Sequence, residues 1–425
     1  MKRAIFCIVC CLTSLRGASK CLGMLGDAIG GRAPSWTSVQ NWVLRFGLYI
    51  LTRPVPRRND WVVILDQAIN LGTKKLLLVL AVSLETLRKN EFKLRHQDMR
   101  VVAISIEEHC DGERVAAVLE EVSGRVGCIV QAVNDGGSNL KKGIREFQKS
   151  HPGVVATSDI THATALLLKN KFECDRRLLA FTNKVTEVRR LVAQTEFACV
   201  APPKPRDKSR WQNLDLYLSW AERIQTLRAA PSPPGRPSKK QAVLQAKRER
   251  LFGWLDGFGP DMAEWKNCLT VLNRANTMVK RDGLGRASAD NFCRLLATEV
   301  GAEASSKMAK NVTTFLRDQG AALPDENAWL GCSDIIESIF GKYKLFTSRT
   351  PLAEMGKAVL IIPAMTAELC PWEIAKAMAT ISTADVNLWL AKNVGKSLVA
   401  QRIKLLGTKS KVKLKETILP KAAGF

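Results

Sequence analysis

Two aspartates stand at the ends of apolar runs. Asp66 follows the apolar residues 61–65, and Asp135 closes residues 128–134 and is followed by two glycines. Such runs predict buried strands. An unpaired carboxylate there costs on the order of several kcal/mol unless a cation or hydrogen bonds compensate. If the two strands are neighbours, both side chains can meet at one sheet edge, so the pattern predicts a two-carboxylate metal site.

A third carboxylate, Glu337, lies on a helix predicted to begin after Ser333 and to bury a stripe of apolar residues. Glu337 and Lys344 are two helical turns apart and share a face. A carboxylate that completes a metal site, with a lysine beside it for a substrate phosphate, fits that spacing. A surface ion pair on an amphipathic helix is the alternative.

The elements around these residues predict an α/β fold. Strands are expected over 61–66, 76–82, 101–106, 128–135 and 154–159, with helices over 112–122 and 138–149. The first two strands should form an antiparallel hairpin, and the whole a mixed sheet with helices packed over it. Beyond His162 the pattern is helical to residue 317, which predicts an inserted helical domain. Its tryptophans (Trp211, Trp220, Trp254 and Trp265) are expected in its core more often than as base-stacking platforms.

The N-terminal segment, 14–51, reads as helix, turn, helix. Polar side chains face away from the buried stripe of the second helix, as suits a recognition helix in a DNA major groove. These residues are Thr37, Ser38, Gln40, Asn41 and Arg45. A helical hairpin with a polar face is the alternative. The resulting division is a DNA-binding domain (1–52), a basic linker (53–60), a catalytic domain (61–165 and 330–350), the helical insertion (166–329) and a basic C-terminal helical region (351–425).

The composition favours a polyanionic partner. The chain has 425 residues, which is enough for two or three domains. Its formal charge of +24 is typical of proteins that bind nucleic acid. Two proline-rich basic loops (201–210 and 231–240) and the tail lysines Lys404, Lys409, Lys411, Lys413 and Lys415 would hold a phosphate backbone. Twelve dispersed cysteines favour reduced thiols in a cytoplasmic protein. The N-terminus mimics a signal peptide, but we interpret it as an amphipathic helix, with no membrane association.

Together, Asp66, Asp135, the Asp159-Ile160-Thr161-His162 sequence and the segment from Glu337 to Lys344 resemble the catalytic core of DDE transposases of bacterial insertion sequences, within the ribonuclease-H-like superfamily. The spacings are 69 residues between the aspartates, 24 to Asp159 and 202 from Asp135 to Glu337. The long last gap resembles the hAT transposases and the RAG recombinase, which carry a helical insertion before the glutamate.

This resemblance implies a ribonuclease-H-like sheet with a large all-α insertion and metal-dependent DNA strand cleavage and strand transfer. Asp66, Asp135 and Glu337 would bind two Mg²⁺ ions, which Mn²⁺ can replace, because hard divalent cations prefer carboxylate oxygens. Asp159 and His162 would support the site, or else be a helix cap and a core histidine. Lys342 and Lys344 would contact double-stranded DNA, at transposon ends and target, and a homodimer or higher oligomer is expected. The protein would be associated with the bacterial nucleoid.

Two other functions remain open. A structure-selective nuclease such as a junction resolvase would use the same carboxylates but would not need an end-reading helix-turn-helix. A non-catalytic DNA-binding protein derived from a transposase would bind DNA without cutting it.

Overall fold

The computed structural model describes residues 1–29, 33–69, 74–204, 213–230, 238–299, 306–348 and 356–395. These residues form two compact units. The first comprises Met1–Thr157 and Ser333–Phe425, and the second Ser158–Cys332. The proline-rich loops lie partly, and the tail lysines wholly, outside the described residues.

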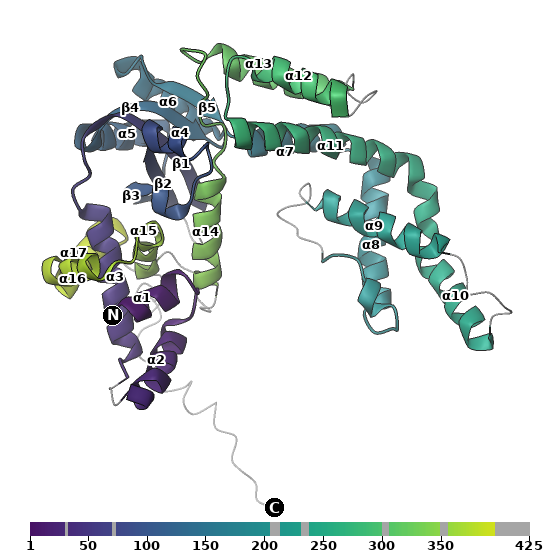
Figure 1. The fold of residues 1–425 in the computed structure, drawn as a ribbon, viewed down its shortest axis with the longest axis horizontal. Coiled ribbons are helices and arrows are strands. Elements are labelled where there is room, and N and C mark those ends of the chain that lie inside the picture. The colour runs from purple at the N-terminus through teal and green to yellow at the C-terminus, as the bar shows by residue number, and fades with distance from the viewer. Residues whose placement is uncertain are drawn as a thin grey trace, which may run out of the picture. The chain divides into compact units, whose positions relative to one another are not determined.

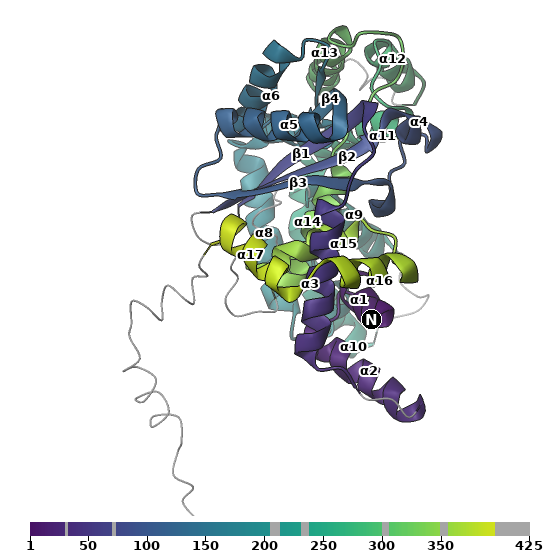
Figure 2. The ribbon, with the colours of Figure 1, turned by 90° about the vertical axis from the view of Figure 1, so that its left-hand side faces the viewer.

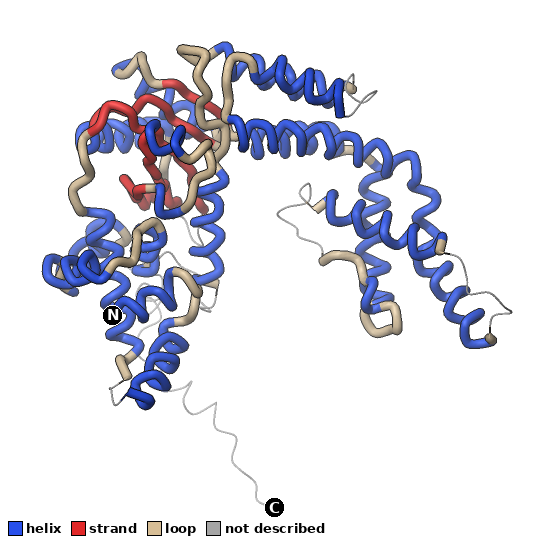
Figure 3. Tube along the Cα trace, in the orientation of Figure 1, coloured by secondary structure: helices blue, strands red, loops and turns tan. Residues whose placement is uncertain are grey.

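The first unit is built on one five-stranded mixed sheet, drawn in red in Figure 3. Its strands are β1 (Arg58–Ile69), β2 (Lys75–Ser83), β3 (Arg100–Glu107), β4 (Gly127–Asn134) and β5 (Val155–Ser158). The spatial order is β3-β2-β1-β4-β5. β1 pairs antiparallel with β2 and parallel with β4, and β2 pairs antiparallel with β3. The five predicted strands and the β1–β2 hairpin are confirmed.

Helices cover both faces of this sheet (Figures 1 and 2). On one face, α5 (Gly112–Val126) and α6 (Ser138–Ser150) close a core with the side chains of Trp61, Val63 and Leu65 from β1. The opposite face carries α14 (Asp334–Thr347), which packs against β1, and α15 (Ile361–Met365), which packs against β3. Because side chains alternate along a strand, β1 supplies apolar residues to both layers.

The helices at the two ends of the chain pack together in the first unit. The remaining elements there are α1 (Lys2–Val9), α2 (Leu15–Ile29), α3 (Trp36–Thr52), α4 (Leu84–Lys89), η1 (His96–Asp98), η6 (Lys357–Leu360), α16 (Pro371–Thr380) and α17 (Thr383–Asn393). α3 is the centre of this packing, with contacts to α1, α2, α15, α16 and α17. A helix with so many neighbours buries most of its length, and the C-terminal half of α3 is almost wholly buried.

The second unit is helical, as predicted. Its elements are α7 (Ile160–Phe172), α8 (Arg176–Val192), η2 (Ala198–Val200), α9 (Leu214–Ala229), α10 (Lys239–Phe252), η4 (Gly253–Phe258), α11 (Gly259–Asp282), α12 (Ser288–Glu299) and α13 (Lys307–Ala321). Trp220 and Trp265 are buried, and the rings of Trp254 and Trp265 pack against Phe181 at centroid distances of 5.6 and 5.2 Å. The core interpretation of these tryptophans is confirmed, while Trp211 lies outside the described residues.

Within the described ranges, no helix combines the length and the apolar character needed to cross a bilayer.

Gly47 is required by the close approach of α3 to η6. A Cβ atom at this position would overlap the carbonyl oxygen of Leu360. We expect Gly47→Ala to lower the free energy of unfolding by about 1–3 kcal/mol, measured by chemical denaturation, because the backbone of η6 must move. Gly124→Ala is the matched control: this α5 glycine faces open space, so alanine should stabilise by about 0.5–1 kcal/mol. Equal effects of the two changes would contradict the packing argument.

Candidate active site

The register of β1 and β4 brings the two predicted aspartates to the same edge of the sheet. Ile64 pairs with Val133 and Leu65 with Asn134 in the parallel ladder. Asp66 is the next residue of β1, and Asp135 is the first residue after β4. Neighbouring parallel strands end at one edge, so the two residues lie at the same edge of the sheet. Both residues are half-buried.

The face on which Asp66 lies follows from strand alternation. Trp61, Val63 and Leu65 belong to the core beneath α5 and α6, so Asp66 belongs to the opposite face. That is the face against which α14 packs. Asp66 also accepts a hydrogen bond of 2.6 Å from the backbone N–H of Gln67.

Glu337 lies in the first turn of α14, on the exposed side of a helix that buries Ile336, Ile339, Phe340 and Tyr343. The helix therefore carries Glu337 to the same face of the sheet as Asp66. The ligand oxygens of Asp66, Asp135 and Glu337 do not all lie within 4.8 Å of one another, since among the described residues that criterion selects a different group. The register thus sets the backbones of Asp66 and Asp135 at one sheet edge, Glu337 lies on the helix that packs against β1, and a metal site formed by the three carboxylates stays a prediction.

A buried polar ladder fixes the loop that carries Asp135. The Asn134 amide donates to the carbonyl of Thr157 (3.2 Å), and its side-chain oxygen accepts from the N–H of Gly136 (2.8 Å). The N–H of Gly137 donates to the Asp135 carboxylate (2.8 Å). Gln131 extends the ladder by donating to the Thr157 hydroxyl (2.8 Å). Gly136 has φ +90°, which favours glycine.

Sequence reasoning missed Gln131 and Asn134. Both are fully or nearly fully buried, at 0% and 2% exposure. Two amides inside an otherwise apolar strand were the available signal, because buried polar groups need partners.

The two lysines of α14 have different surroundings. The ammonium of Lys342 lies 3.0 Å from Nδ1 of His96, and Nε2 of His96 lies 3.0 Å from the hydroxyl of Ser338. Lys342, predicted to contact DNA, is therefore engaged within the protein. Lys344 is exposed, on the same helical face as Glu337. His96 thus ties α14 to the segment that leads into β3.

Tyr343 is buried on the inner face of α14, and burial raises its pKa to about 12. No hydrogen-bond partner for its hydroxyl is found among the described residues. A neutral phenol in that position acts as a packing residue for the helix that carries Glu337.

The predicted recognition face of α3 is only partly open. Thr37 is exposed, whereas Ser38, Gln40 and Asn41 are half-buried. Arg45 donates through Nε to the carbonyl of Ile381 (2.5 Å) and through Nη2 to that of Met378, at the C-terminal end of α16. A guanidinium that satisfies helix-end carbonyls has a structural role. Arg45 is therefore engaged within the protein, and its contact with DNA, like the helix-turn-helix, stays a prediction.

The predicted supporting pair belongs to the second unit. Asp159 is fully buried and caps α7, accepting a hydrogen bond of 2.8 Å from the N–H of Thr161, while His162 is exposed. The capping alternative for Asp159 is confirmed, and the alternative of a core histidine is wrong.

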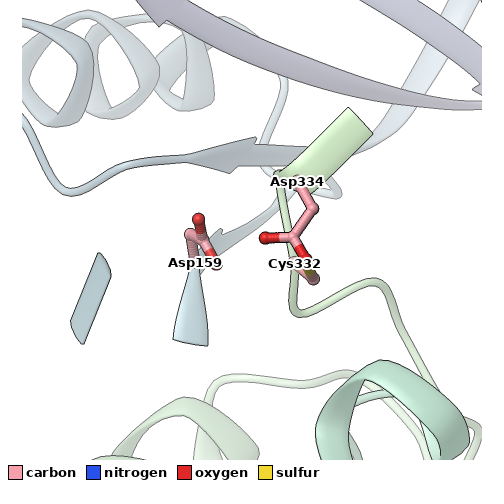
Figure 4. Close-up of side chains that lie close together, drawn as sticks. All are labelled: Asp159, Cys332 and Asp334. Atoms are coloured by element: carbon pink, nitrogen blue, oxygen red, sulfur yellow. The ribbon is translucent and has the colours of Figure 1, made fainter. Parts of the chain in front are cut away.

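A different trio of possible ligands appears near this cap. One ligand atom each of Asp159, Cys332 and Asp334 lies within 4.8 Å of the others (Figure 4). The cap already occupies an oxygen of Asp159. Acidic residues gather in this way in many proteins that bind no ion, so this trio carries no assignment.

Comparisons with known proteins give little further information. No family model matches the chain, and no curated protein matches it. A solved structure, the Drosophila P element transposase strand transfer complex, is similar at 11% identity and a TM-score of 0.36, covering 88% of this chain and 92% of that one. The first unit itself is an α/β fold on a five-stranded mixed sheet, compatible with a ribonuclease-H-like fold.

The contact between His96 and Lys342 predicts a pH-dependent stability. Burial, and then the charge of Lys342, lower the pKa of His96. The unfolded chain therefore binds a proton at a higher pH than the folded chain, so stability is complete above about pH 6.5 and falls as the pH drops toward the lowered pKa. We expect denaturation midpoints measured from pH 7.5 to 5 to fall less steeply in His96→Gln than in wild type.

His162→Gln, which changes an exposed histidine of the second unit, is the matched control and should keep the wild-type slope. An unchanged slope in His96→Gln would show that this contact does not govern the acid sensitivity.

Proposed function

We propose that the protein is a DNA transposase that cleaves at transposon ends and joins the freed 3′ hydroxyl to target DNA, using Asp66, Asp135 and Glu337. The single observation that supports this most is the parallel register that sets Asp66 beside Asp135 at one sheet edge. The place of Glu337 on α14, which packs against β1, adds a third carboxylate on the same face of the sheet.

The donor set suits a hard divalent cation. Mg²⁺ prefers carboxylate oxygens and keeps part of its water shell, so half-buried carboxylates at a sheet edge are suitable donors. Asp66, Asp135 and Glu337 would hold the ion or ions. When bound, such ions stabilise charge on the attacking and leaving oxygens of a phosphodiester.

The chain's own residues then have defined tasks. The ladder from Gln131 to Gly137 would hold the Asp135 carboxylate in place while the substrate binds, because its members are buried and hydrogen-bonded. Lys344, exposed two turns from Glu337, would contact a backbone phosphate of the bound strand. The charge of +24 would attract DNA without sequence preference, with an affinity that falls steeply as salt rises.

The alternative of a structure-selective nuclease uses the same carboxylates, and strand transfer is the property that separates the two. A transposase joins a precut end to a second DNA molecule, whereas a resolvase yields cut products only. A non-catalytic DNA-binding protein would yield neither.

Removal of one carboxylate charge should almost abolish DNA cleavage. We expect Asp66→Asn, Asp135→Asn and Glu337→Gln each to lower Mg²⁺-dependent cleavage of DNA by at least about a hundredfold, the scale on which loss of a transition-state electrostatic contact acts. DNA binding, measured by fluorescence anisotropy in the absence of metal, should stay within about twofold. Glu146→Gln is the matched control, an exposed carboxylate on α6 at the other face of the sheet. Cleavage at the wild-type rate by all three site variants would reject this assignment.

Metal binding has a readout that does not depend on activity. The repulsion among the clustered carboxylates should be relieved by a cation, so Mg²⁺ or Mn²⁺ should raise the Tm of the wild-type protein. A ligand present at a hundred times its Kd stabilises by about 2.7 kcal/mol. The shift should be lost in Asp66→Asn and Asp135→Asn and kept in Glu146→Gln. An equal shift in all four proteins would place the metal elsewhere.

A further inference from the structure

A cavity of about 670 Å³ lies in the first unit at the sheet edge opposite to the aspartates. Its wall includes Arg58 at the start of β1, Ser83 at the end of β2 and Arg100 at the start of β3, and Trp372 and Glu373 of α16 line it as well. Arg58 and Asp66 are eight residues apart in β1, which corresponds to about 26 Å of extended chain. The cavity is therefore separate from the candidate active site, and its volume is in the range of small-molecule sites.

The charges on the cavity wall are unevenly paired. Arg53 is bound to the buried carboxylate of Glu373. Arg58 is paired with Asp60 and Glu85, both at 2.7 Å, and Asp98 accepts from the N–H of Arg95 at 2.7 Å. Arg100 is half-buried and has no ion pair within the part of the chain that the structure describes. The remaining acidic residue on the wall, Glu368, is exposed, so solvent screens it.

Two guanidinium groups act on each other inside this cavity. Burial, and then the charge of Arg100, lower the pKa of Arg53. Like charges in a partly desolvated site repel, and because Glu373 already pairs with Arg53, an anion beside Arg100 would remove the repulsion that remains. Arginine presents several N–H donors in a planar fork that matches the oxygens of a phosphate.

An aromatic surface accompanies the arginines. Trp372 is 66% exposed, an unusual state for so large an apolar side chain, and it lines the cavity beside Glu373. An exposed indole face beside a cationic pocket is suited to stacking with a nucleobase, which every base can do irrespective of sequence. Gln97, exposed on the same wall, offers an amide to a base edge.

We propose that this cavity binds one nucleotide unit, with its phosphate held by Arg100 beside Arg53 and its base stacked on Trp372. The unit can belong to a free nucleotide or to a nucleic acid strand, since both present a phosphate next to a base. The proposal does not depend on the function of the sheet edge that carries Asp66 and Asp135, the aspartate edge.

Isothermal titration calorimetry of the full chain tests this with AMP, adenosine, inorganic phosphate and a short oligothymidylate. AMP should bind at least about tenfold more tightly than adenosine or phosphate, because only AMP makes both contacts. Arg100→Gln should weaken AMP and phosphate binding about tenfold, whereas Arg100→Lys should keep most phosphate binding. Trp372→Ala should weaken AMP binding about fivefold or more and leave phosphate binding unchanged.

The matched controls change residues of the same type outside the cavity: Arg88→Gln on α4 and Trp36→Ala at the start of α3, both exposed. Both should bind AMP as the wild type does. Oligothymidylate binding that is tighter than AMP binding and sensitive to Arg100→Gln would assign the site to a strand, and the reverse order to a free nucleotide. The proposal is overturned if AMP does not bind, if adenosine binds as well as AMP, or if the site and control variants behave alike.

Asp66→Asn separates this inference from the proposed function. It should retain AMP binding whether or not the aspartate edge cuts DNA. Loss of AMP binding in Asp66→Asn would show that the nucleotide occupies the aspartate edge, which contradicts the cavity assignment.

Discussion

The parallel pairing of β1 with β4 is the constraint on which the rest of the first unit depends. β1 is buried on both faces and hydrogen-bonded on both sides, to β2 and to β4. A strand in that position cannot slip by one residue without turning its apolar side chains to the wrong layer. Because Leu65 is fixed opposite Asn134, the position of Asp66 relative to Asp135 is set by the apolar core of the sheet and needs no contact between the carboxylates.

The same edge shows how a polar site is attached to an apolar core. Gln131, Asn134 and Thr157 satisfy one another across β4 and β5 where water is excluded. A fully satisfied buried network is rigid, since each broken bond leaves an unpaired polar group at a cost of about 1–3 kcal/mol. The loop that carries Asp135 thus begins at a strand end that this network holds in place.

Local patterns in the sequence were sufficient to predict the strands of the sheet, but not the tertiary contacts of the helices around it. Runs such as 61–65 and 128–134 predict strands because period and composition are local properties. The partners of Arg45 and Lys342 are not local: Arg45 reaches carbonyls more than 300 residues away, and Lys342 meets His96 across 246 residues. A polar residue on a helical face is predicted to be solvent-exposed unless its tertiary neighbour is known. Nothing in residues 36–52 indicates that α16 packs against α3.

The position of Glu337 depends on whether the apolar packing of α14 outweighs the repulsion among the carboxylates. Carboxylates gathered at a sheet edge repel one another, although solvent screens an exposed one such as Glu337. α14 buries Ile336, Ile339, Phe340 and Tyr343, and each such side chain contributes about 1.5–3 kcal/mol. Their sum, about 6–12 kcal/mol, offsets the repulsion. Apolar packing therefore holds α14, and Glu337 with it, on this face of the sheet without any contribution from the carboxylates.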